Sequence, residues 1–179
     1  MKTPTMIVLL LALGGCASQS CDMPWSESAC REDRLLYQND LMQAKILIAS
    51  GDEEGYELAH ALLNRSARQD QRGETEFYRA LLMIRQGPQT TEVIRMLDRA
   101  ADKDHPHAIA LLYKIYDEPY LVDQPDPAKA RQYRERYGEL DVAQSGYPSF
   151  DKAREVVDQL LDAPQQLVEQ RTAEEPADD

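Results

Sequence analysis

The sequence predicts an all-α protein in which antiparallel helix hairpins stack into an α/α superhelical solenoid. From Glu32 onward apolar residues recur at spacings of three and four, as in Phe77, Leu81 and Ile84, which is the period of a helix with one buried face. Prolines and glycines fall between the apolar runs, where helices end. No run of alternating β-branched residues indicates a strand.

These prolines and glycines divide the chain into seven predicted helices. Their starts are indicated by a capping side chain or a first-turn proline, at Asp52, Thr90, His105-Pro106, Asp126-Pro127 and Ser149. The predicted helices cover residues 31–49, 53–69, 74–86, 91–103, 106–117, 127–137 and 149–162.

Helix 106–117 is apolar on two faces. Ala108, Leu111 and Ile115 share one side, whereas Leu112 and Tyr116 share the next. Such a helix has to be covered from both sides. Because the links between helices are short, successive helices form antiparallel hairpins, and hairpins that need neighbours on both sides stack into a solenoid.

One stretch resembles a known repeat. The string Ala100-Ala101-x-x-Asp104-His105-Pro106-x-Ala108-x-x-x-Leu112-x-x-x-Tyr116 resembles the junction between two Sel1-like repeats, a tetratricopeptide-related family, and Asp126-x-x-Lys129-Ala130-x-x-Tyr133 resembles the opening of that repeat's second helix. The paired alanines let two helices approach closely. The resemblance covers about residues 74–137. Tyr113 departs from it, since the family usually has Gly there, and residues 118–125 replace its glycine-rich loop.

The N-terminus has the layout of a secretory signal. Lys2 precedes an apolar run from Met6 to Leu13, which is too short for a membrane-spanning helix of about 20 residues. Leu13-Gly14-Gly15-Cys16 resembles the lipobox of bacterial lipoproteins. The resemblance implies that residues 1–15 are a signal peptide, that the Cys16 thiol is diacylated, and that Ala17 directs the chain to the outer membrane. The alternative is an ordinary signal peptide that holds a cysteine.

Cys21 and Cys30 are then an even pair in a compartment that permits disulfides. Eight residues separate them, so they are not a redox CxxC motif. We expect a structural bridge in a short tether, residues 16–30, between the lipid and a helical-repeat domain over residues 31–163. Two free thiols are the alternative.

Composition argues against several function classes. The net charge of −12 repels nucleic acid. His105 and His107 flank Pro106 like a metal pair, but no further Cys or His stands nearby to complete a zinc site. We expect no metal and no cofactor. Hydrolase and phosphate-binding motifs are missing from the sequence, which therefore predicts a protein that is not an enzyme.

Aromatic residues are the candidate partner contacts. The chain has nine tyrosines against two phenylalanines, and tyrosine is enriched at interfaces. Tyr116 and Tyr133 are interpreted as residues of the repeat seam. The candidates for partner binding are Tyr78, Tyr113, Tyr120 and Trp25, the last of which alternatively caps the open end of helix 31–49.

Residues 164–179 are expected to be an acidic, disordered tail, because Thr172 to Asp179 has no large apolar residue. The whole pattern predicts an outer-membrane lipoprotein that faces the periplasm and acts as a scaffold for protein partners. The resemblance implies an adaptor role like that of lipoproteins in exopolysaccharide export or of pilotins that deliver secretins. An envelope enzyme, an inhibitor of one, or a peptidoglycan-binding protein are the alternatives, and the oligomeric state is left open.

Overall fold

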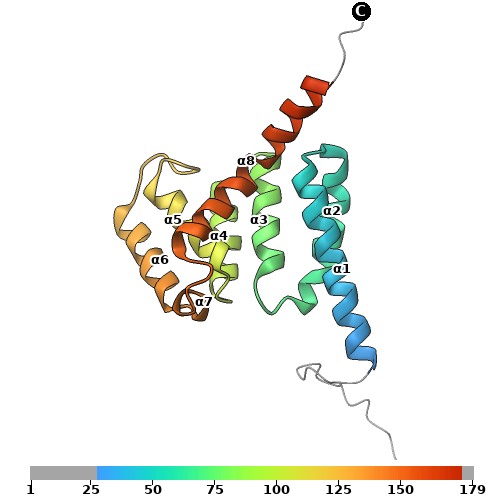
Figure 1. Ribbon diagram of the computed structural model, residues 1–179, viewed down its shortest axis with the longest axis horizontal. Helices are drawn as coiled ribbons and strands as arrows, with labels where there is room; N and C mark the ends of the chain where they lie inside the picture. The colour runs from blue at the N-terminus through green and yellow to red at the C-terminus, as the bar shows by residue number, and fades with distance from the viewer. Residues whose placement is uncertain (1–27, 175–179) are drawn as a thin grey trace, which may run out of the picture.

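The structure is a computed structural model that describes the chain from Ser28 to Glu174, with side chains from Arg31 to Asp162. Every regular element in this range is a helix, so the predicted all-α class is confirmed (Figure 1). None of these helices is long and apolar enough to cross a bilayer. The helices are α1 (Ser28–Ser50), α2 (Tyr56–Ser66), α3 (Glu74–Gln86), α4 (Thr90–Ala101), α5 (Pro106–Asp117), α6 (Pro127–Glu139), α7 (Asp141–Gln144) and α8 (Phe150–Glu174), with 3-10 turns at Glu53–Gly55 and Ala67–Gln69 on either side of α2.

Four of the five predicted helix starts are capped as expected. In each of them a side chain accepts a hydrogen bond from a backbone N–H two or three residues later, and the capping residues are Asp52, His105, Asp126 and Ser149. The prediction for Thr90 is wrong. Its hydroxyl donates instead to the carbonyl oxygen of Leu121 at 2.9 Å, which fastens the long loop before α6 to the start of α4.

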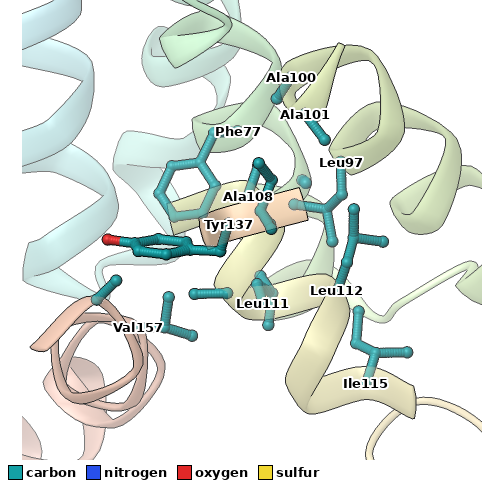
Figure 2. Close-up of a cluster of buried hydrophobic side chains, with 14 of the residues drawn as sticks. Phe77, Leu97, Ala100, Ala101, Ala108, Leu111, Leu112, Ile115, Tyr137 and Val157 are labelled. Carbon is teal, nitrogen blue, oxygen red and sulfur yellow. The ribbon is translucent and has the colours of Figure 1, made fainter. Parts of the chain in front are cut away.

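The larger hydrophobic core surrounds α5. This helix is buried on both predicted faces, and residues 108–112 are fully inaccessible to solvent. Leu97 of α4, Tyr137 of α6 and Val157 of α8 converge on it (Figure 2). A smaller cluster joins α1 and α2 to Leu82 of α3. Helix α5 is therefore the central element of the domain.

The paired alanines act as the sequence predicts. Ala100 and Ala101 are both fully buried at the end of α4. A Cβ placed on Gly73, at the start of α3, would lie only 2.7 Å from the Cα of Ala100. The backbones of the α3 and α4 ends therefore touch.

Helix α8 packs mainly against helices that are distant from it in the sequence. It packs on α5 and crosses the face of the bundle to contact both α6 and α1 (Figure 1). The sequence places its end at residue 162 and a tail from Pro164. The helix instead runs to Glu174, and residues 175–179 lie outside the described range.

A side chain from another helix explains why proline is tolerated inside α8. Because Pro164 has no N–H, the carbonyl of Leu160 lacks its helical donor. The Arg85 guanidinium of α3 donates to that carbonyl oxygen at 2.7 Å. This bond fixes α8 to α3.

Arg85→Ala should therefore destabilise the protein by about 1–3 kcal/mol, the cost of a buried polar group left without a partner. In a Pro164→Ala background the new amide can satisfy Leu160, and the same Arg85 substitution should cost clearly less. Urea denaturation of the four proteins in this double-mutant cycle measures the coupling. Equal costs in both backgrounds would refute the role assigned to Arg85.

Candidate functional site

The structure contains a cleft of about 950 Å³ where α3 and α5 begin and α6 ends. The helix starts form one wall, while α1 and α7 close the sides. Eight of its fourteen lining residues are charged, four of each sign. The lining residues are Lys45, Arg72, Glu74, Tyr78, Lys103, Asp104, His105, Pro106, His107, Arg136, Glu139, Leu140, Asp141 and Val142.

His105 is the most constrained side chain of the cleft. It is only 6% exposed, and its ring stacks on Phe77 with centroids 4.7 Å apart. Its Nδ1 accepts the backbone N–H of Ala108 at 3.1 Å, so the proton of the neutral ring is on Nε2. Burial, with smaller effects of His107 and Lys45, lowers the pKa of His105 to about 3.

His107 stands beside it as a second neutral imidazole. The two rings meet edge to face at 5.7 Å. Burial lowers the pKa of His107, an effect that nearby Glu74 opposes. A neutral His107 can donate and accept hydrogen bonds, while His105 keeps only its Nε2 proton to donate, which suits the cleft to polar ligands such as peptide groups.

The buried His105 predicts a specific loss of stability in acid. Its folded pKa lies below the ordinary value of about 6.5, so the unfolded chain binds the proton more readily and stability falls as the pH drops below that value. Between pH 7 and pH 5 this contribution should cost about 2 kcal/mol.

His105→Asn keeps a capping side chain and removes the titrating group. We therefore expect the stability difference between wild type and this variant to shrink as the pH falls from 7 to 5, in denaturation curves recorded at each pH. A difference that is independent of pH would contradict the assignment of a neutral, buried His105.

Internal contacts hold three of the four cations of the cleft, Lys45, Lys103 and Arg136. Lys45 Nζ lies 2.6 Å from a Glu74 carboxylate oxygen and 4.8 Å from the centre of the Tyr78 ring. Arg136 donates to the carbonyl of Ala101 at the end of α4. These contacts hold α1, α3, α4 and α6 at fixed positions around the cleft.

Asp70 organises the wall between α2 and α3. Its carboxylate accepts the N–H groups of Glu74 and Thr75 at 3.1 and 3.2 Å. Lys103 Nζ donates to the Asp70 carbonyl oxygen at 2.7 Å. Asp70 was not among the predicted caps, although an acidic residue just before helix 74–86 is a signal for one.

The structure separates the three tyrosines proposed as partner contacts. Tyr78 lines the cleft, half-buried, where burial and Glu74 raise its pKa to about 12. Tyr113 packs edge to face on Phe150 of α8, with ring centres 5.0 Å apart. Tyr120 lies half-buried against the core beside Lys114. The three tyrosines therefore lie in different surroundings, and their role in partner binding remains a prediction.

Tyr116 and Tyr133 pack against each other within the domain. Their rings stack almost in parallel, with centroids 5.9 Å apart. The Tyr133 hydroxyl donates to a carboxylate oxygen of Asp98 at 2.8 Å. This pair joins α6 to α5 and α4.

Several predicted site residues lie outside what the structure describes. Cys16, Cys21 and Trp25 precede Ser28, and the side chain of Cys30 is also outside the described range although its backbone is in α1. The predicted lipidation and disulfide remain predictions. Among the described side chains no three His, Cys, Asp or Glu residues are grouped to hold a metal ion.

Comparison with known proteins gives no family model, no curated protein and no solved structure that matches the chain. The resemblances to Sel1-like repeats and to a lipobox therefore also remain predictions.

Proposed function

We propose that this chain is an outer-membrane lipoprotein that faces the periplasm and acts as an adaptor, holding an extended segment of a partner protein in the cleft. In this proposal Cys16 carries the lipid, and helices α1 to α6 are three hairpins of a superhelical solenoid. Successive helices in this part of the chain pack against one another, which is the arrangement that such a solenoid requires.

The observation that carries the proposal is the lining of the cleft. Pockets for small ligands are mostly apolar, whereas most residues here are charged. Charges of both signs line the cleft together with the rings of Tyr78, His105 and His107. An extended polypeptide offers amides and side chains of both signs, so its chemistry complements this surface.

Two adaptor settings fit the proposal, an exopolysaccharide export assembly and the delivery of a secretin by a pilotin-like factor. Both require a folded domain that holds a protein segment close to the membrane. An envelope enzyme or inhibitor, or a peptidoglycan-binding protein, are the competing functions, and the experiment below distinguishes them by what is captured.

Photo-cross-linking in intact cells tests the cleft. A photoreactive residue at Glu139, which lines the cleft, should capture one defined protein, identified by mass spectrometry. The matched control is the same residue at Glu57, which is exposed on α2 and outside the cleft. Equal capture of unrelated proteins at both positions, or capture of peptidoglycan fragments at Glu139, would contradict the proposal.

The anchor is tested separately. Cys16→Ser removes the thiol that the lipid needs, so lipid labelling and cleavage before residue 16 should both be lost. The mass of the mature N-terminus measures both effects. A wild-type N-terminus downstream of Cys16 without lipid would contradict the anchor and leave the cleft result unaffected.

A further inference from the structure

Helix α1 has two apolar faces, and the described part of the chain covers only one. Leu41 and Ile48 point into the small cluster between α1 and α2. On the other face Leu35 is 56% exposed, and Met42 and Ile46 are each 60% exposed. A terminal hairpin of a stacked array normally has a polar outer face, and a row of large exposed apolar residues marks an interaction surface.

The spacing of this row is that of a coiled coil. Leu35, Asn39, Met42, Ile46 and Ala49 follow one another at intervals of four, three, four and three residues, which places them at alternating d and a positions of a heptad repeat. We call these five residues the α1 seam. Only Ala49 is partly covered within the domain.

The seam is free of charge in a strongly charged chain. Its flanking positions hold Leu36, Gln38 and Gln43, and in a parallel pair Lys45 would face Ser50 of the other copy. Because the chain has a net charge of −12, a second copy would be repelled at most other surfaces. The α1 seam lets two copies approach without placing like charges opposite each other.

We propose that the α1 seam binds the same seam of a second copy as a short, parallel, two-stranded coiled coil. Asn39 indicates this occupant, because a single Asn at an a position pairs with its own counterpart and thereby fixes both register and a two-stranded state. The parallel direction rests on the proposed lipid anchor, since two chains attached to one membrane near their N-termini start α1 on the same side.

The free end of α1 gives the second copy access. Residues 31–36 are all exposed, and this end of α1 extends beyond the rest of the bundle (Figure 1). The seam extends over about 22 Å at 1.5 Å per residue. Two heptads make a weak dimer in dilute solution, and tethering to one surface raises the effective concentration to about millimolar.

Cysteine cross-linking of the purified chain at about millimolar concentration tests the dimer without its anchor. Cys16, Cys21 and Cys30 are first changed to serine, so that each new thiol can react only with another copy. In a parallel pair Leu35→Cys and Asn39→Cys should each form a disulfide dimer upon oxidation. The matched control is Asp33→Cys, which is exposed on α1 but outside the seam, and it should give at least tenfold less dimer.

The outcomes separate the alternatives. No excess of dimer at the seam over Asp33→Cys would overturn the proposal. An antiparallel pair places a positions opposite d positions, so it would cross-link Leu35→Cys with Ile46→Cys in mixtures and neither one with itself, which would overturn the parallel arrangement. Failure of the Cys16 experiment would remove the anchor and leave this result standing.

Met42→Glu provides the converse test. Because Met42 is exposed, this variant should keep the wild-type thermal midpoint, and in the Leu35→Cys chain, which keeps Asn39, it should abolish the disulfide dimer. An unchanged yield of dimer would show that the cross-link does not arise from the seam.

Discussion

Gly73→Ala is expected to destabilise the protein by about 2–5 kcal/mol. Gly73 precedes α3 with φ of +74°, and a residue with a Cβ costs about 1–2 kcal/mol in this left-handed conformation. The new Cβ would also lie 2.7 Å from Cα and 2.8 Å from the carbonyl oxygen of Ala100. Separating α3 from α4 to relieve that overlap should add about 1–3 kcal/mol, as for an overpacked core.

The matched control for this substitution is Gly146→Ala. Gly146 has φ of +80°, and a Cβ there would meet nothing within 4 Å. It carries the backbone strain alone, so it should cost only about 1–2 kcal/mol. Urea denaturation of both variants measures the difference, and equal losses would show that α3 and α4 can move apart freely.

Leu112→Ala should cost about 2–5 kcal/mol, as a truncation that leaves a cavity in a packed core. Leu112 is fully buried on the central helix α5 (Figure 2). Leu58→Ala is the matched control, because Leu58 on α2 is 53% exposed and its truncation should change stability by only about 0.5 kcal/mol. Thermal and urea melts compare the two variants. A harmless Leu112→Ala would mean that α5 is not central to the fold.

Local signals in the sequence predicted most of the helices. The apolar period and the caps at Asp52 and Asp126 depend only on residues within a few positions of each other, so they can be read along the chain. The end of α8 could not be predicted in this way. Pro164 normally ends a helix, and it is tolerated here because Arg85, far away in the sequence, donates to the Leu160 carbonyl.

The cleft was beyond sequence reasoning for a similar reason. Its residues extend along the chain from Lys45 to Val142 and meet only through the packing of five helices. The cap at His105 could be predicted, because its position before Pro106 indicates a capping role. The packing of Tyr113 could not be predicted, since nothing near it in the sequence indicates that Phe150 would lie against its ring.

A titration followed by nuclear magnetic resonance tests whether the cleft holds a segment of a partner protein. The segment captured from position 139 is synthesised and added to the ¹⁵N-labelled protein. The amide shifts should change around residues 103–107 and 139–142, which line the cleft, and His107→Ala should weaken binding. Shift changes confined to the outer face of α1, with the cleft amides unmoved, would contradict the claim.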